Sequence, residues 1–251
     1  MRGLSRLLVI PAFLLLWQAA FWASGGQSYI LPAPQQVAEA WWDRHEVIFD
    51  HAWVTALEIL LGLGLGALLG AVAALCMAAS PHVRRWMLPV LVASQAVPVF
   101  ALAPILVLWL GYGMASKVAM AVIIIFFPVA AAFLDGLRRT EPGWLDLARC
   151  MDAPPLALLL QIRLPAALPA LASGLRVAAA VAPIGAVIGE WVGSSAGLGY
   201  LMLQANARMQ IPVMFAALAT LAVFSVALYV SIDWLLRRAL PWQADAHPLN
   251  H

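Results

Sequence analysis

The chain has 251 residues, of which 64% are hydrophobic and only 10% are charged, and its mean hydropathy is +0.91. A soluble domain has about 25% charged residues, so this chain has too few charges to cover its own surface in water. The net charge of +2 is also too small to indicate nucleic acid as a partner. The composition therefore predicts an integral membrane protein in contact with lipid.

Six hydrophobic segments follow one another along the chain, and each is close to the ~20 residues that a bilayer-spanning helix needs. They lie at residues 7–23, 54–79, 87–110, 117–136, 168–189 and 212–236. Arg2 and Arg6 precede the first segment, as in a signal peptide, but no small-residue cleavage site follows it cleanly. A retained first helix is the favoured interpretation, and the sequence predicts an all-α, multi-pass protein.

Residues 35–50 separate the first two segments and alternate polar and apolar residues at roughly helical spacing. This pattern predicts a short amphipathic helix lying on the extracytoplasmic surface of the membrane. Together with the first hydrophobic segment it forms an expected N-terminal unit, residues 1–52. The other five segments form a core unit, residues 53–240, and residues 241–251 form a short cytoplasmic tail.

The second hydrophobic segment carries Gly62, Gly66 and Gly70 at intervals of four, which puts all three on one helix face. The pattern superficially resembles a nucleotide-binding glycine loop, but no strand precedes it and no acidic residue stands where a ribose would need one. In a membrane span, such small residues allow two helix backbones to approach closely. We expect this face to pack against another helix.

The basic residues are sorted by side of the predicted spans. Arg44, Lys117 and Arg208 lie on one side, and Arg176 lies inside the fifth span. The other ten of the fourteen basic residues lie on the opposite side: Arg2, Arg6, Arg84, Arg85, Arg138, Arg139, Arg149, Arg163, Arg237 and Arg238. By the positive-inside rule, both termini are predicted to be cytoplasmic.

A search for chemistry gives no candidate enzyme site. The sequence contains no P-loop, no H-E-x-x-H and no G-x-S-x-G motif, and its five histidines have no metal-ligand spacing. The two cysteines, Cys76 and Cys150, suggest no disulfide framework. We therefore expect no catalytic, metal or cofactor site in this chain.

Four acidic residues lie in or near the predicted spans: Glu58, Asp135, Glu190 and Asp233. A charge at the centre of a membrane is costly and usually functional, but all four lie near predicted helix ends. Local solvation or pairing at the interface is the favoured interpretation for these residues. For Glu190, a functional role stays equally open.

A polar segment, DLARCMDAPPLALLLQIRLP at residues 146–165, lies between the fourth and fifth spans. Thr140 can cap a helix that begins near Pro142, because proline is tolerated in the first helical turn. Asp152 interrupts this helix, and the Pro-Pro pair that ends at Pro155 suits the start of a second helix. We expect two short helices joined by a bend across the cytoplasmic face, a shape suited to docking a partner.

A recognisable motif runs through this segment. It consists of Asp146, Leu147, Ala148, Asp152, Ile162, Leu164 and Pro165. The order and spacing resemble the EAA motif, E-A-A-x(3)-G-x(9)-I-x-L-P, of the membrane-spanning subunits of bacterial binding-protein-dependent ATP-binding-cassette (ABC) importers. Asp146 replaces the glutamate of that motif and Asp152 replaces its glycine. Because aspartate tolerates positive φ better than most residues, the bend is expected to survive.

The resemblance continues through ALPALASGLRVA and GEWVGSSAGLGYLMLQANAR, and it covers most of residues 50–240. Within the family, the chain resembles the nitrate/sulfonate/taurine group. The run Gly189–Arg208 is similar to permeases assigned to the thiamine precursor hydroxymethylpyrimidine. The resemblance thus implies uptake of that precursor, with a sulfonate, taurine or nitrate as the alternative substrate.

This resemblance implies a type I ABC importer permease fold, with six transmembrane helices and a cytoplasmic coupling helix between the fourth and fifth. It implies a homodimer of two permease copies in the bacterial inner membrane, two cytoplasmic ATP-binding subunits that hydrolyse the ATP, and an extracytoplasmic substrate-binding protein. The residues expected to couple the chain to the ATPase are Asp146, Leu147, Ala148, Arg149, Met151, Asp152, Ile162, Leu164 and Pro165. Those assigned to the translocation path or its gate are Glu190, Gly197 and Gly199.

Two other classes of membrane protein fit the sequence less well. An ion-coupled secondary carrier would need acidic residues at the membrane midplane, and the sequence places none clearly there. A membrane-embedded enzyme or assembly factor would need a nucleophile or a metal constellation, which the sequence lacks.

The arginine distribution predicts that residues 24–52 and 190–211 face the exterior and that residues 136–166 face the cytoplasm. In a background without the two native cysteines, Ser28→Cys should react with a membrane-impermeant maleimide in intact cells, and Arg149→Cys should react only after lysis. A reporter that works only in the cytoplasm should be active when fused after Arg238. Protection of the Ser28 position together with labelling of the Arg149 position in intact cells would contradict this topology.

Overall fold

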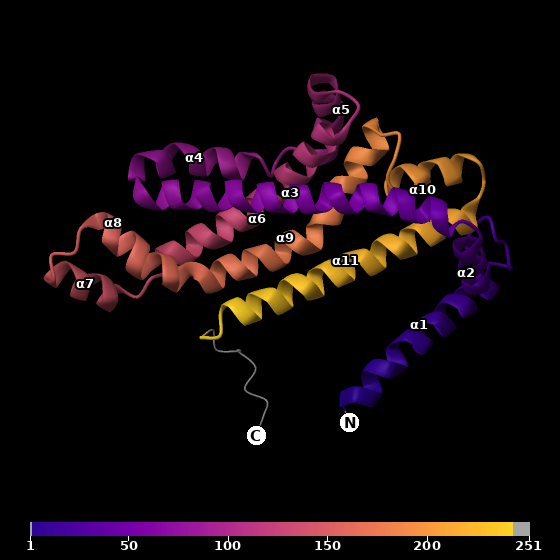
Figure 1. Cartoon of the computed structure of the whole chain (residues 1–251), viewed down its shortest axis with the longest axis horizontal. Coiled ribbons are helices and arrows are strands. Elements are labelled where there is room, and N and C mark those ends of the chain that lie inside the picture. Colours follow the sequence, from indigo (N-terminus) through magenta and orange to yellow (C-terminus); the bar gives the residue numbers. More distant parts are fainter. Residues whose placement is uncertain (1, 243–251) are drawn as a thin grey trace.

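Helices run along nearly the whole chain in the computed structural model, which describes residues 2–242 and the side chains from Pro11 onward (Figure 1). The helices of the N-terminal half are α1 (Arg2–Ala23), α2 (Pro34–Asp43), α3 (His45–Ala79), α4 (Pro81–Ala93), α5 (Val99–Leu110) and α6 (Met114–Arg138). Those of the C-terminal half are α7 (Pro142–Cys150), α8 (Pro155–Ala157), the π-helical η1 (Leu158–Arg163), α9 (Leu164–Gly193), α10 (Leu198–Ala207) and α11 (Ile211–Ala239). The all-α prediction is confirmed.

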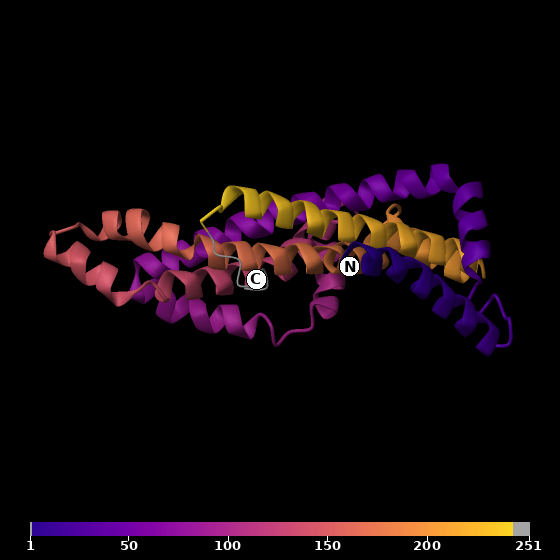
Figure 2. The same cartoon turned by 90° about the horizontal axis from the view of Figure 1, so that it is seen from below.

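The central contact of the bundle is made by α6, which packs against both α3 and α9 (Figures 1 and 2). Further contacts join α11 to α9, α10 and α2. By contrast, α1 diverges from the other helices (Figure 1). It contacts them through Trp17, whose ring lies 6.1 Å from that of Phe215 on α11 and whose Nε1 donates to the Pro32 carbonyl at 3.0 Å.

Small residues form much of the buried interior, whereas many large apolar side chains point outward. Ala178, Ala182 and Ala186 of α9 are fully buried, while Leu68 of α3 and Val223 of α11 are exposed. This distribution suits a protein surrounded by lipid, since apolar side chains gain nothing by leaving lipid for the interior. Helices in a membrane associate instead through close packing of small residues.

The glycine face of α3 packs against α6, as predicted. A Cβ atom added at Gly62 would overlap Ala121, one at Gly66 would lie 2.7 Å from Cγ2 of Ile125, and one at Gly70 would lie 2.9 Å from a carbonyl oxygen of α6. These separations leave no room for a side chain. The two backbones therefore approach as closely as they do because α3 carries glycine at each contact.

The expected uninterrupted helix at residues 87–110 is wrong. The chain leaves the helical conformation at residues 94–98, between α4 and α5, where Pro98 is extended with φ −58° and ψ 118°. A proline within a helix removes one backbone hydrogen bond and disfavours helical geometry at the residue before it. Within the described residues, four helical stretches are long and apolar enough to cross a membrane, namely α3, α6, Pro155–Gly193 and α11, so the count of six spans stays a prediction.

The single amphipathic helix expected at residues 35–50 is also wrong. The chain turns at Arg44, and the second half of this stretch is the start of α3. The first half, α2, packs against α11: Val37 is buried, and Nε1 of Trp41 donates to the hydroxyl of Thr220 at 3.1 Å. The alternating pattern thus reflects one face packed on protein.

The two ends of the bundle differ in the segments they carry. The α3–α4 junction, the connection from α6 to α9 and the C-terminal end of α11 gather toward one end, and these segments carry most of the arginines (Figure 1). The opposite end carries α2 and the turns on either side of α10 (Figure 1). The positive-inside rule predicts that the arginine-rich end is the cytoplasmic one.

Gly66→Leu is expected to lower the free energy of unfolding by at least about 2 kcal/mol, because the new side chain would overlap Ile125 across the contact between α3 and α6. The melting temperature and yield of the purified chain measure this effect. Gly64→Leu is the matched control, since a Cβ at Gly64 meets nothing within 4 Å. Equal stability of the two variants would show that the glycine face carries no packing constraint.

Candidate functional site

The connection between α6 and α9 projects from one end of the bundle and begins with α7 (Figure 1). The predicted Thr140 cap does not form. Thr140 is buried, and its hydroxyl donates to the carbonyl of Leu137 at 3.3 Å, so it stays with the preceding helix. The start of α7 at Pro142 instead relies on proline, whose fixed φ suits a first helical turn.

One face of α7 exposes large apolar side chains. Trp144, Leu147 and Met151 stand three and four residues apart and are all more than half exposed. Ala148 lies on the same face but is only 5% exposed, so its methyl group is covered by the chain itself and is not presented outward as expected. Its carbonyl accepts hydrogen bonds from the amides of Met151 and Ala153 at 3.2 and 3.0 Å, which closes the helix. Ala148 thus helps to fix the shape of this connection between α6 and α9, which is called the projection below.

The bend after α7 forms at Asp152, whose φ is +53°. The prediction that this aspartate takes the place of a bend glycine is therefore confirmed in its backbone geometry. On α7, Asp146 and Arg149 form an exposed ion pair at 2.9 Å. Such a pair contributes little to stability, about 0.5 kcal/mol, and leaves both charges accessible to a partner.

The second helix of the projection is not a separate short helix. From Pro155 the chain passes through α8 and η1 into α9 without a break. The middle portion, η1, is π-helical, which means that each turn there holds more residues than an α-helical turn. Ile162 and Leu164, both half-buried, and the exposed Pro165 lie at the junction of η1 and α9.

A hollow of about 620 Å³ lies between the exposed face of α7 and the start of α9. Its lining includes Trp144, Leu147, Ala148, Met151, Ile162, Pro165 and Trp242. The structure thus brings five of the nine expected coupling residues to one hollow. The other four, Asp146, Arg149, Asp152 and Leu164, do not line it. Because its walls are mostly apolar, the hollow can accept an apolar side chain from a partner.

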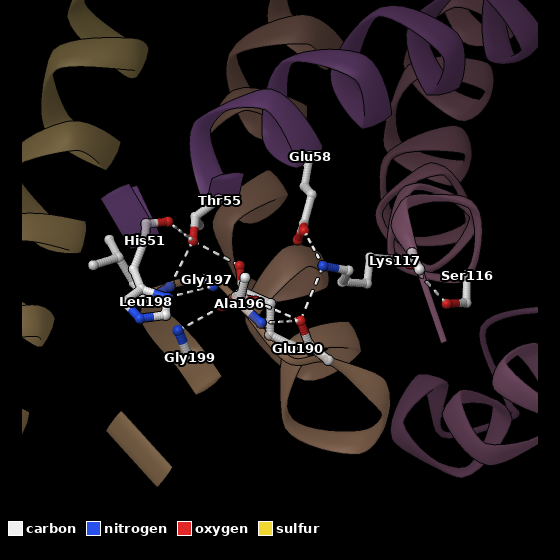
Figure 3. Close-up of polar contacts among 12 residues, drawn as sticks. His51, Thr55, Glu58, Ser116, Lys117, Glu190, Ala196, Gly197, Leu198 and Gly199 are labelled. Atoms are coloured by element: carbon white, nitrogen blue, oxygen red, sulfur yellow. Dashed lines mark hydrogen bonds and ion pairs between the residues drawn. The ribbon is translucent and has the colours of Figure 1, made fainter. Parts of the chain in front are cut away.

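A second polar site lies toward the other end of the bundle, where Glu190 of α9 is fully buried (Figure 3). One carboxylate oxygen accepts from the hydroxyl of Thr55 on α3 at 2.6 Å, and the other accepts from the amide of Gly199 at 2.5 Å. Gly199 is in the first turn of α10, where unpaired amides and the helix dipole favour a negative charge. Glu190 therefore caps α10 from a different helix.

The two glycines of this site make room for the Glu190 carboxylate. Gly197 has φ +114°, a conformation that favours glycine, and a Cβ at this position would overlap the carboxyl group of Glu190. A Cβ at Gly199 would lie 2.8 Å from Oε2 of Glu190. The amide of Gly197 donates to Nδ1 of His51 at 2.9 Å (Figure 3). The three residues that the sequence assigned to a gate thus come together as one unit.

An ion pair between Glu58 of α3 and Lys117 of α6 lies beside this unit (Figure 3). Nζ of Lys117 is 2.5 Å from Oε1 of Glu58 and also donates to the hydroxyl of Ser194 at 3.0 Å. Both charged residues are buried, so of the two alternatives left open for Glu58, solvation or pairing, the structure shows pairing. Asp233 is also paired, with Arg176 at 2.7 Å and with Arg237 at 2.9 Å.

These contacts join α3, α6, α9 and α10 by polar interactions inside an apolar bundle. Sequence reasoning did not predict Thr55 or Lys117 as members of this site, because each contacts residues far away in the chain. The described residues contain no group of three His, Cys, Asp or Glu side chains that could hold a metal ion. The arrangement suits holding helices together rather than covalent chemistry.

The bundle thus combines helices long enough to span a membrane, a projection with an exposed apolar face and, at the other end, a polar clamp formed by Thr55, Glu58, Lys117, Glu190, Gly197 and Gly199. A protein-family model described as "Binding-protein-dependent transport system inner membrane component" matches residues 66–242. The chain belongs to this family.

Curated relatives agree with this assignment. A probable ABC transporter permease protein of Haemophilus influenzae is 56% identical over 94% of this chain and 97% of its own length. The formylaminopyrimidine transport permease protein ThiX of Halalkalibacterium halodurans is 38% identical over 87% of this chain and 88% of its own. The riboflavin transport system permease protein RibX of Chloroflexus aurantiacus is 35% identical over 92% and 87%.

A solved structure of similar fold is a chain of the MetNI methionine ABC transporter in an inward-facing conformation. It aligns with 78% of this chain and 97% of its own length, with a TM-score of 0.69 and 17% sequence identity. The fold is therefore that of the type I ABC importer permeases. Permeases of this class are transport components that work with ATP-binding subunits and substrate-binding proteins, and the ATPase activity lies in the partner subunit.

Replacing Glu58 by Gln should lower the free energy of unfolding by about 3 kcal/mol, because it leaves the Lys117 ammonium buried without its counter-charge. The double variant Glu58→Gln/Lys117→Met should recover most of that loss. Melting temperatures of the purified variants measure both effects.

The control for this cycle is Asp146→Asn, which removes an exposed ion pair and should cost less than about 1 kcal/mol. The cycle compares Glu58→Gln alone, Lys117→Met alone and the double variant. If the losses of stability in the two single variants simply add in the double variant, the two side chains are not coupled in the folded protein.

Proposed function

We propose that this chain forms the translocation path of an ATP-driven importer and that residues 142–163 are its coupling element for the ATP-binding subunits. The observation that carries the proposal is the exposed apolar face of α7, which lies beside a hollow at the arginine-rich end of the bundle. Contiguous apolar surface outside the lipid marks a site of protein interaction. Leu147 and Met151 would contact the ATPase, with Asp146 and Arg149 at the rim.

The continuity of the projection with α9 supports a mechanical role. A displacement of α7 passes through the bend at Asp152 into α8 and η1, and from there into α9 without an intervening loop. Because α9 packs against α6, and α6 against α3, the displacement reaches the whole core. In this mechanism, closure of the ATPase dimer draws two coupling elements together and the helices rock from inward-open to outward-open. Ile162, Leu164 and Pro165 keep the start of α9 in register with the projection.

The polar clamp would act at the extracytoplasmic end, where a binding protein delivers substrate. We assign Glu190, Gly197 and Gly199 to the gate because they fix the corner between α9 and α10. In this assignment, the corner moves as one body with α9 when the path opens outward.

A second copy of the chain is the proposed partner in the membrane. A hollow of about 770 Å³ with almost wholly apolar walls runs between α5, α9, α10 and α11. Its lining includes Phe100, Ile184, Trp191, Met202 and Leu218. A homodimer that joins these faces would enclose a path between the two subunits in the bacterial inner membrane, with all four termini in the cytoplasm.

For the substrate, we propose the thiamine precursor hydroxymethylpyrimidine. The relative whose name specifies a formylaminopyrimidine supports a substituted pyrimidine, and the resemblance of Gly189–Arg208 to hydroxymethylpyrimidine permeases points the same way. A sulfonate, taurine or nitrate is the alternative, and the relative named for riboflavin adds a flavin to the compounds to be tested.

Leu147→Arg tests the coupling element. The change puts a charge on the exposed face of α7, and it should reduce co-purification of the ATP-binding subunit and transport by at least about tenfold, because burying an unpaired charge in an interface costs several kcal/mol. Leu156→Arg is the matched comparison within the coupling element and should have a milder effect: the two leucines are 63% and 66% exposed, but Leu156 lies beyond the bend and outside the hollow beside α7.

Both variants should keep the parental melting temperature, since both side chains are exposed. Ala148→Arg should instead lower it, because Ala148 is covered. Normal ATPase binding and transport by Leu147→Arg would exclude α7 as the docking surface.

The substrate proposal is tested by reconstituting the permease with its ATP-binding subunit and binding protein in liposomes. ATP-dependent accumulation of radiolabelled hydroxymethylpyrimidine is expected. An excess of unlabelled taurine, an alkanesulfonate, nitrate or riboflavin should leave the uptake unchanged. Uptake of any of these in place of the pyrimidine would overturn the assignment without affecting the coupling mechanism.

A further inference from the structure

A second hollow, of about 480 Å³, lies on the other side of the bend from the hollow beside α7. It is bounded by the C-terminal end of α3, the last turn of α7 and the α8–η1 stretch. Its lining includes Ala79, Arg149, Pro155, Leu156, Leu159 and Arg163. Several of these residues belong to the proposed coupling element, and Arg149 lies at the rim of its ATPase contact, but the coupling mechanism uses no ligand in the hollow itself.

The hollow contains a half-buried cation, Arg163, that forms no ion pair within residues 11–242. Nε of Arg163 is buried, and within residues 11–242 it has no hydrogen-bond partner. An arginine side chain stays protonated at any physiological pH, so it cannot reduce the cost of burial by losing its charge. Arg149, an exposed residue, contributes a second guanidinium, whose Nη1 donates to Asp146 at 2.9 Å. The hollow therefore suits an anion with several acceptor oxygens.

The π-helical turn is a second observation that points to this place. Arg163 is the last residue of η1. Short π-helical segments disturb regular backbone hydrogen bonding and occur frequently at functional sites. The extra residue in the turn changes the direction in which the following side chains point. An irregular turn that ends at a half-buried arginine whose Nε has no partner within residues 11–242 is readily explained if that arginine has a ligand.

The remaining walls and the position of the hollow identify the kind of anion. Leu156, Leu159 and Ala79 give the hollow an apolar side next to the two guanidinium groups. The hollow also lies where α3 ends and where the chain enters α9, which is the headgroup level of the cytoplasmic leaflet if these two helices span the membrane. Basic pockets at the cytoplasmic ends of membrane helices are suited to anionic lipid headgroups.

We propose that this hollow, with Arg163 and Arg149 as its cationic groups, is a binding site for the phosphate of an anionic phospholipid. The phosphate oxygens accept from the two guanidinium groups, and the first part of the acyl region lies along Leu156 and Leu159. Because the site adjoins both α7 and the start of α9, a bound lipid fills the space under the bend and stabilises the angle between the projection and the bundle.

The full-length chain in mild detergent, without its partner subunits, is titrated with dioleoylphosphatidylglycerol or dioleoylphosphatidylcholine, and lipid occupancy is read by native mass spectrometry. We expect phosphatidylglycerol to bind at least about tenfold more tightly than phosphatidylcholine, as charge-assisted hydrogen bonds imply. Arg163→Gln should abolish this preference. Arg163→Lys keeps the charge but loses the two-pronged geometry, and it should retain only part of the preference. The matched control, Arg85→Gln, removes an exposed arginine from the same end of the bundle and should keep it in full.

Three results would overturn the proposal. An undiminished preference for phosphatidylglycerol in Arg163→Gln would mean that the lipid binds elsewhere. Displacement of the lipid by inorganic phosphate at equal concentration would indicate a site for a free anion. Unchanged lipid binding together with loss of ATPase co-purification in Arg163→Gln would assign the hollow to an acidic side chain of the partner. Since lipid binding is measured without the ATPase, failure here and failure of the coupling mechanism are separable.

Discussion

The backbone of α6 lies so close to α3 and α9 that several contact points on these neighbours are glycine. Gly62, Gly66 and Gly70 of α3 and Gly174 and Gly185 of α9 all meet atoms of α6 at distances that exclude a Cβ. In lipid this contact gains no help from the hydrophobic effect, so its stability comes from dispersion and from close fit. Every other arrangement in the molecule uses this three-helix unit as its support, including the projection at one end and the polar clamp at the other.

The polar clamp has a different physical character from the glycine contacts. A buried Glu58–Lys117 pair adds little net stability compared with apolar residues of the same size, because both charges must be stripped of solvent. It is more demanding in geometry, since any relative shift of α3 and α6 would separate the charges. Dispersion contacts set the distance between the helices. The Glu58–Lys117 ion pair and the Glu190 cap together fix how the helices are aligned along their axes.

Sequence patterns predicted some of these features because only one physical cause fits them. Glycines four apart in an apolar helix have little use except a close helix contact, and Pro154 and Pro155, two residues beyond Asp152, cannot continue the preceding helix. The hydrophobicity of residues 87–110 did not reveal the break at residues 94–98, because hydrophobicity reports contact with lipid and carries no information on whether the helix is continuous. The motif placed Ala148 among the coupling residues, but it could not show that this residue is covered by the chain itself. The pairing of Glu58 with Lys117 could not be predicted, since it depends on which helices are neighbours in space.

The π-helical turn at Leu158–Arg163 makes the orientation of the projection depend on residue count as well as on contacts. A π-helical turn amounts to one residue inserted into an α-helix. Deleting a single residue there would allow the stretch from Pro155 to Gly193 to become regular, and it would turn everything before it by about 100° about the axis of α9. The exposed face of α7 would then point sideways rather than toward a partner. If α7 is the docking surface, as proposed, a single inserted residue sets the direction in which it faces the ATP-binding subunit, and a one-residue length difference in a homologous permease would change that direction in one step.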